Sequence, residues 1–261
     1  MTFRLDITAE MVGRHDLSLW LNGLCVTPKT GYCVVVDSSV KPLSTLDTNG
    51  EKYMSITLDC GFYGDQTDET LAVLEKYGVK CTFFMTGYFL NNFSEEAKRI
   101  RDAGHEIGNH SYSHPRLLDI DMSRRVNEIV STSRLCEQVL GVTPRLFRPP
   151  YGNTDYTVSG IARGEGMEVT MWTIDSHDWD NNKTHAQVLT RIKHNVVPGS
   201  IILFHLDGFD TPKTLDEIIP YYTEELGMTL VPVTELMAHG GRELPPLPNE
   251  GMTTIVSTQV Q

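Results

Sequence analysis

The sequence predicts an α/β fold, namely a distorted (β/α) barrel with about seven parallel strands and a short N-terminal β extension. Apolar, β-prone runs alternate with amphipathic helical segments, which is typical of parallel strands joined by helical crossovers. A polar cluster closes each of five strand-like runs, as in barrels whose strand ends share one mouth. The length of 261 residues fits one large domain, and 40% hydrophobic residues can build a substantial core.

The N-terminal part of the chain is expected to differ from the barrel. The three expected regions are a β extension or cap at residues 1–50, the barrel at 51–240 and an irregular tail at 241–261. Val34-Val35-Val36 and the run to Leu46 are typical of short strands. Asn49-Gly50 predicts a hairpin turn into the first barrel strand. The tail is rich in proline from Pro245 onward, which disfavours regular structure.

Periodicity and end signals define the barrel elements. The helix at residues 68–77 places Leu71, Leu74 and Tyr77 on one stripe and stops at Gly78. Strands are predicted at residues 53–58, 79–85, 106–108, 145–147, 169–174, 201–204 and 228–233. Further helices are predicted at residues 94–104, 123–140, 184–196 and 215–226 and around Leu236.

The charge balance limits the possible partners. With 22 basic and 34 acidic residues, the formal net charge is −12, which argues against nucleic acid or an anionic membrane as the main partner. Every apolar run is far shorter than the roughly 20 residues that span a bilayer. The N-terminus shows no apolar core of a secretory signal. The sequence leaves the oligomeric state open.

Five cysteines occur, without a Cys-x-x-Cys pair. Cys81 and Cys136 stand among apolar neighbours and are expected to be buried thiols. Cys25 and Cys33 either form a disulfide, if the protein is secreted, or stay reduced. The fifth, Cys60, lies inside a polar cluster.

The polar clusters at the strand ends are the strongest functional signal. They are Thr57-Leu58-Asp59-Cys60-Gly61, His110-Ser111-Tyr112-Ser113-His114, Arg148-Pro149-Pro150-Tyr151-Gly152, Asp175-Ser176-His177-Asp178-Trp179 and Leu203-Phe204-His205. His110 and His114 are four residues apart, so one helical turn would place both imidazoles on one side. Two histidines and a carboxylate form a common zinc site.

In this order, the five clusters resemble those of the NodB-homology polysaccharide deacetylases, carbohydrate esterase family four, and of chitin-deacetylase-like members in particular. The resemblance runs from about Tyr53 to Leu236. It implies metal-dependent N-deacetylation of N-acetylglucosamine polymers, with chitin or a related glycan as the partner. It also implies a secreted or cell-surface location, although no signal is visible in this sequence.

The resemblance assigns roles to the residues. His110 and His114 would be metal ligands and Asp59 the general base, paired with Arg148. His205 would be the general acid, with its imidazole held by Asp178. Substrate-binding roles fall on the Tyr151 backbone N–H, which would stabilise the oxyanion, and on Trp179 and Leu203, which would line an acetyl pocket. Asp175 and His177 are expected to be structural or solvated.

Cys60 is the one departure from the family motif, which has a metal-binding Asp at this position. We therefore expect lost or severely weakened metal binding, no cofactor, and little or no deacetylase activity. One alternative is an active zinc-dependent deacetylase or amide hydrolase that uses Cys60, His110 and His114, because a thiolate is a good zinc ligand. The other alternative is a non-catalytic glycan-binding protein.

Overall fold

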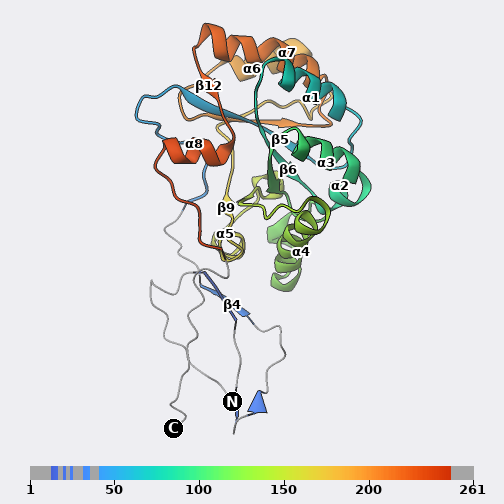
Figure 1. Ribbon diagram of the computed structural model, residues 1–261, viewed down its shortest axis with the longest axis vertical. Coiled ribbons are helices and arrows are strands. Elements are labelled where there is room, and N and C mark those ends of the chain that lie inside the picture. Colours follow the sequence, from blue (N-terminus) through green and yellow to red (C-terminus); the bar gives the residue numbers. More distant parts are fainter. Residues whose placement is uncertain (1–12, 17–19, 22–23, 26–31, 36–40, 248–261) are drawn as a thin grey trace.

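The structure is a computed structural model that describes residues 13–16, 20–21, 24–25, 32–35 and 41–247 (Figure 1). Seven parallel strands form one curled sheet in the order β10-β11-β5-β6-β7-β8-β9. Their bounds are β5 Tyr53–Cys60, β6 Thr82–Met85, β7 Glu106–Asn109, β8 Leu146–Phe147, β9 Glu168–Val169, β10 Ile174–Asp175 and β11 Ile201–His205. A further strand, β12 (Thr229–Leu230), pairs in parallel with the start of β5. The predicted distorted (β/α) barrel is confirmed.

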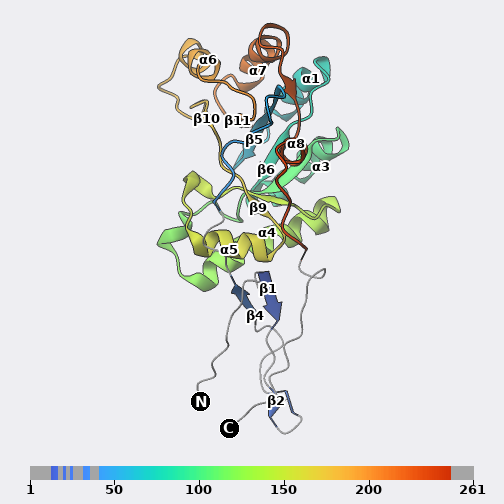
Figure 2. The ribbon, with the colours of Figure 1, turned by 90° about the vertical axis from the view of Figure 1, so that its left-hand side faces the viewer.

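Most of the helices lie on the outer side of the sheet (Figures 1 and 2). The helices are α1 Thr67–Lys76, α2 Gly87–Asn92, α3 Ser94–Asp102, α4 Met122–Leu140, α5 Tyr156–Gly164, α6 His185–Lys193, α7 Thr211–Pro220 and α8 Val233–His239. Helix α8 packs against residues of the inner face of the sheet. Local signals fix several of their ends. Asp121 caps α4 by accepting a hydrogen bond from the Arg124 backbone N–H, and Gly141 ends that helix in the left-handed conformation.

Strand β5 separates the core from the site because its side chains alternate between two faces. Ile56, Leu58 and Cys60 belong to the main apolar cluster, which packs between the sheet and the helices. Thr57 and Asp59 point to the inner face, where both contact the Arg148 guanidinium. All of these side chains are buried. On β5 the outer face is therefore apolar and the inner face polar, whereas Phe84 and Ile201, on the inner faces of the neighbouring strands, pack in an apolar cluster with α8.

The gap between the edge strands β9 and β10 is bridged by a segment that precedes β5. Leu43 pairs in parallel with Thr170, and Thr45 pairs antiparallel with Ser200. The Leu46 backbone N–H donates to the Gly199 carbonyl at 3.1 Å. Residues 43–46 therefore belong to the wall of the barrel.

The N-terminal β structure is present in the described residues. Strand β1 (Gly13–Asp16) pairs antiparallel with β4 (Tyr32–Val35), and β2 (Trp20–Leu21) pairs antiparallel with β3 (Leu24–Cys25). Both β1 and β4 lie next to α5 (Figure 2). The predicted boundaries at residues 50 and 240 stay predictions, and most of the predicted tail lies outside the described residues.

Several sequence expectations need correction. The strand predicted at 169–174 is two strands, because the chain leaves β8 after Val169 and joins β11 at Ile174. The helices α2 and α5 were not predicted. The turn at Asn49-Gly50 exists, with φ of 53° and 83°, but the segment before it forms only isolated bridges, so it is no hairpin. The last predicted strand, 228–233, shortens to β12.

Three cysteine side chains are described, and all three are buried free thiols: Cys60, Cys81 and Cys136. The expectation for Cys81 and Cys136 is confirmed. The side chains of Cys25 and Cys33 lie outside the described part of the chain, so their pairing stays open. Within that part, no helix has the length and apolar character needed to cross a membrane.

A glycine pair tests how tightly residues 43–46 join the barrel. Gly199 and Gly50 both adopt positive φ, at 82° and 83°. A Cβ on Gly199 would meet the Leu46 carbonyl oxygen at 1.7 Å, whereas a Cβ on Gly50 meets nothing within 4 Å. We expect Gly50→Ala to cost about 1 kcal/mol of the free energy of unfolding, from backbone strain alone. Gly199→Ala should cost about 2 kcal/mol more, because packed backbone must move.

Urea denaturation of the two variants measures the difference, and Gly50→Ala serves as the matched control for strain. Equal losses in the two variants would show that residues 43–46 move away from Gly199 without cost.

Candidate active site

A buried ion pair lies at the centre of the strand ends. The Arg148 Nη1 donates to Asp59 Oδ1 at 2.8 Å and to Thr57 Oγ1 at 2.9 Å. Its Nη2 and Nε donate to the carbonyl oxygens of Met171 and Thr170, at 3.0 Å and 3.3 Å. The Arg148 side chain has no exposed surface. Burial opposes ionisation of Asp59, but neighbouring cations and imidazoles outweigh it, so the pKa of this carboxyl lies below its usual value.

His110 follows β7 and lies against this ion pair. Its Nδ1 lies 2.8 Å from the Arg148 carbonyl oxygen, so this nitrogen carries the proton and donates. Its Nε2 lies 3.3 Å from Asp59 Oδ2. Burial lowers the pKa of the imidazole, and the nearby Asp59 only partly offsets this effect. The Nε2 lone pair of a neutral His110 therefore faces the carboxylate.

His114 stands over His110, with ring centroids 4.8 Å apart. Its backbone is left-handed, with φ of 57°. Burial, and then the nearby His110, lower the pKa of His114 to about 3, so it is neutral at pH 7. The ring of Tyr151 lies 4.7 Å away. Both imidazoles are thus neutral and adjacent, as a pair of metal ligands must be.

Two side chains that the sequence analysis missed hold this loop in place. The Glu128 carboxylate, on α4, accepts from the Tyr112 and Ser113 backbone N–H groups at 3.0 Å and 2.8 Å, and from the Ser113 hydroxyl. The Asn109 side chain accepts from the Ser111 N–H and donates to the Ile129 carbonyl. Glu128 lies on the stripe of the helix predicted at 123–140 that is expected to be buried. A charged residue at such a position was the signal that could have identified it.

His205 ends β11 and is the register partner of Asp59 in the parallel pairing with β5. Its Nδ1 lies 2.8 Å from Asp178 Oδ1. The Asp178 Oδ2 accepts from the His205 backbone N–H and from the Thr211 hydroxyl, each at 2.9 Å. Burial alone would lower the pKa of His205, but the Asp178 carboxylate reverses the shift and raises it to about 9. This imidazole is therefore protonated at pH 7 and can donate a proton.

The structure brings six predicted site residues together at this mouth: Asp59, His110, His114, Arg148, Asp178 and His205. Of the predicted substrate-binding residues, Tyr151 and Trp179 are more than half exposed, at 58% and 54%. Leu203 is buried and shares the inner face of β11 with His205. Asp175 accepts from the His177 backbone N–H and fixes that turn, which fits the structural role expected for it.

Cys60 points away from the histidines' mouth, into the apolar cluster on the other face of β5. Its side chain has no exposed surface. Burial, and then the carboxylates of Asp59 and Asp207, raise the pKa of the thiol well above its ordinary value. The thiol is therefore protonated at neutral pH, and a thiol is not a zinc ligand until it loses its proton. Asp207, which the sequence analysis did not consider, lies beside Cys60 and Gly61.

At the position of the family's metal site, the described donors are two neutral nitrogens and a protonated thiol. Among the described residues, no group of three or more His, Cys, Asp or Glu side chains is arranged to hold one. His110 and His114 supply two neutral nitrogens, and the residue that would supply the third donor is a protonated thiol in an apolar cluster.

Comparison with known proteins gives one consistent family. The family model for polysaccharide deacetylases matches residues 47–170. A peptidoglycan-N-acetylglucosamine deacetylase of Bacillus cereus is 30% identical over 196 residues, which cover 73% of this chain and 91% of the relative. PdaC of Bacillus subtilis, a peptidoglycan-N-acetylmuramic acid deacetylase, is 33% identical over 74% of this chain and 40% of its own length. The chain spans only 40–62% of the length of three relatives at 32–34% identity, PdaC among them.

Among solved structures, BA3943 of Bacillus anthracis superposes with a TM-score of 0.71 and 30% identity, over 76% of this chain and 69% of that one. It is described as a pseudoenzyme of the CE4 family. A mutant of the same protein, 31% identical to this chain, is described as having restored enzymatic activity.

The His205–Asp178 pair predicts a pH dependence of stability. The pKa of His205 in the fold, about 9, lies above its ordinary value of 6.5. The pair therefore contributes its full stability below pH ~6.5 and loses it as the pH rises through about 9, a contribution of about 3 kcal/mol. In Asp178→Asn, we expect a His205 pKa below 7 and no corresponding fall in stability between pH 6.5 and 9.

NMR titration of the His205 imidazole and urea denaturation at pH 6 and pH 9.5 measure the two effects. The wild-type protein is the reference at each pH. A His205 pKa near 6.5 in the wild type would contradict the charge state assigned to this residue.

Proposed function

The chain belongs to the polysaccharide deacetylase family, and from this premise we propose that it is a pseudoenzyme with little or no deacetylase activity. Its relatives include peptidoglycan deacetylases. We propose that its ancestral reaction was metal-dependent N-deacetylation of an N-acetylglucosamine polymer, such as peptidoglycan, chitin or a related glycan. The observation that carries the proposal is the buried, protonated Cys60 at the position of the metal-binding carboxylate.

Asp59 and His205 keep the protonation states that acid–base catalysis needs. Asp59 is held ionised by Arg148 and could accept a proton from a water molecule. His205 is held protonated by Asp178 and could donate a proton to a leaving amine. Neither group makes water a strong nucleophile, because the pKa of free water is 15.7 and that of a carboxylic acid about 4. Loss of the third metal ligand therefore removes the activation of water and leaves the two proton transfers in place.

The zinc-dependent alternative requires Cys60 to lose its proton and to turn toward His110 and His114. Its apolar surroundings and the carboxylates of Asp59 and Asp207 both oppose the thiolate. The pseudoenzyme BA3943 supports the opposite outcome, since a relative of similar fold carries that description. We therefore favour loss of activity over a Cys-His-His zinc site.

Glycan binding is the second candidate function, and exposed aromatic rings near the mouth favour it. Trp179 and Tyr151 carry large exposed faces. Phe62 packs edge-on against Tyr88 and against His114, with centroids 5.4 Å and 5.9 Å away. Exposed apolar rings grouped around a polar mouth are typical of a binding surface. A surface of this kind can hold a sugar chain without cleaving it.

The first test of the proposal is a change at Cys60. We expect the wild-type protein, after dialysis against zinc, to hold far less than one zinc per chain and to release no acetate from N-acetylglucosamine oligomers. Cys60→Asp should raise the zinc affinity at least tenfold, because a carboxylate is unfavourable in the apolar cluster and can instead turn toward a zinc ion on the two neutral imidazoles. Without zinc, the variant should lose about 2 kcal/mol or more of stability, because its carboxylate is buried near Asp59 and Asp207.

Calorimetry with zinc and thermal unfolding with and without zinc measure these effects. Cys60→Ser is the matched control, since it changes the same atom without adding a carboxylate. Stoichiometric zinc in the wild-type protein, with turnover that falls in Cys60→Ala, would overturn the proposal and favour the zinc-dependent hydrolase.

The second test concerns glycan binding. We expect Trp179→Ala to weaken binding of an N-acetylglucosamine tetramer about tenfold, because stacking on an exposed ring is worth about 1–1.5 kcal/mol. Val197→Ala is the control, because Val197 is also exposed but precedes β11, at the opposite end of the barrel from the mouth. Isothermal calorimetry measures both. Tight binding that is unchanged by Trp179→Ala would place the glycan elsewhere.

A further inference from the structure

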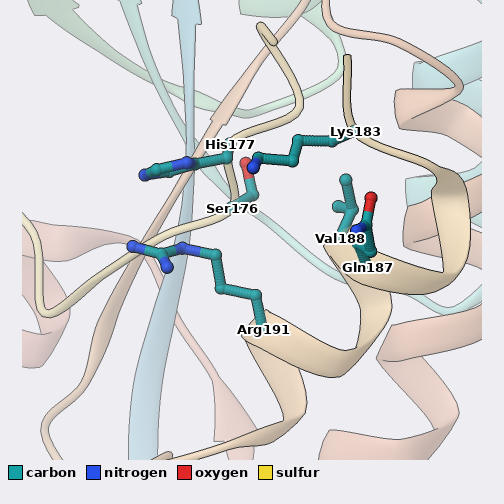
Figure 3. A pocket seen from close by; sticks show the side chains of 6 residues that line it. All are labelled: Ser176, His177, Lys183, Gln187, Val188 and Arg191. Carbon is teal, nitrogen blue, oxygen red and sulfur yellow. The ribbon is translucent and has the colours of Figure 1, made fainter. Parts of the chain in front are cut away.

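A cavity lies beside the mouth, between the chain after β10 and helix α6. Its volume is about 200 Å³. Its lining residues are Ser176, His177, Lys183, Gln187, Val188 and Arg191 (Figure 3). A drug-sized ligand needs a pocket of roughly 300 Å³ or more, so this cavity suits a small group together with a few water molecules.

The lining is rich in hydrogen-bond donors and contains no carboxylate, in a chain whose formal net charge is −12. In Figure 3, the His177 ring and the Arg191 guanidinium lie on one side of the cavity, and Lys183 reaches toward Ser176 from the other side. The Arg191 Nε donates to the Asp175 carbonyl at 2.5 Å, which fixes the direction of the guanidinium. Its two Nη groups remain as donors for a bidentate acceptor.

The neighbouring carboxylates do not saturate these cations. Asp180 Oδ2 lies 3.9 Å from the Lys183 Nζ, and Asp175 Oδ2 lies 3.6 Å from the His177 Nε2. Both distances exceed that of a direct hydrogen bond. An anion inside the cavity could therefore accept hydrogen bonds from Lys183 and His177 without breaking a short ion pair.

The two neutral polar groups of the lining are held in fixed orientations. The Gln187 Oε1 accepts from the Thr184 backbone N–H in the cap of α6, so the amide nitrogen is the group left for a ligand. The Ser176 side chain is fully buried, and its oxygen accepts from the Asp178 N–H at 3.2 Å. His177 adopts a left-handed φ of 60°, a costly conformation for a non-glycine residue, and such strain is common at binding sites.

We propose that this cavity binds an oxyanion group, either free phosphate or the carboxylate of an acidic sugar. Two cations, an imidazole and an amide line a space of suitable size, and no lining group carries a carboxylate. The site is also coupled to the mouth, because Ser176 holds the backbone of Asp178, whose carboxylate binds His205. Binding here requires no turnover, so it is independent of the proposed loss of activity.

The experiment is an NMR titration of the ¹⁵N-labelled full chain at constant ionic strength. The probes are inorganic phosphate and glucuronate, with glucose as the uncharged control. We expect saturable shifts of the Ser176, His177 and Gln187 amides. Lys183→Gln and Arg191→Gln should each weaken binding about tenfold, because each removes a charge-assisted hydrogen bond.

Lys193→Gln is the matched control, because Lys193 is on the same helix but lies over the Tyr221 ring. It should change the affinity less than twofold. Saturation by phosphate alone assigns the site to a free oxyanion, and saturation by glucuronate but not glucose assigns it to an acidic sugar. If Arg191→Gln fails to fold, Lys183→Gln decides the question. The proposal is overturned if neither anion shifts these amides, or if Lys193→Gln weakens binding as much as Lys183→Gln does.

Discussion

The buried ion pair between Asp59 and Arg148 is the constraint on which the rest of the site depends. A guanidinium without exposed surface must have its charge balanced and its donors satisfied. Asp59 supplies the charge, and Thr57, Thr170 and Met171 supply the other acceptors. This one side chain therefore ties β5 to the chain that follows β8 and β9. Removal of either partner would leave a buried charge, at a cost of about 3–5 kcal/mol.

Under the proposed pseudoenzyme function, this dependence explains how the metal-binding carboxylate would be lost while the proposed general base persists. Asp59 points to the inner face, where the fold needs its charge. The next residue points to the outer face, where the fold needs only a small apolar side chain, and a protonated thiol meets that need. Selection for stability alone would retain Asp59 and accept Cys60. The same reasoning applies to Asp178, which also satisfies the His205 N–H and the Thr211 hydroxyl.

The sequence was sufficient for the elements with strong periodicity and for the residues at strand ends, because both depend on local patterns. The helices α2 and α5 escaped prediction because Gly87, Tyr88 and Phe89, or Thr157 and Val158, are weak helix formers. Caps at Thr86 and Asp155, and burial of their apolar faces, stabilise these helices instead. Glu128 was missed because its partners are backbone N–H groups of a distant loop. The alternation of strand side chains could have placed Cys60 on the face opposite Asp59.

The surviving motif residues therefore differ in what they reveal about function. Asp59, Arg148, Asp178 and the His110 Nδ1 all make hydrogen bonds that the fold itself requires. Their presence follows from stability and says little about catalysis. The side chains of Trp179 and Tyr151 are different, because they expose large apolar faces that stability would not retain. Under the proposed glycan-binding function, a bound sugar chain would cover these rings, so continuing use of the mouth would be visible at Trp179 and Tyr151 more than at the carboxylates of Asp59 and Asp178.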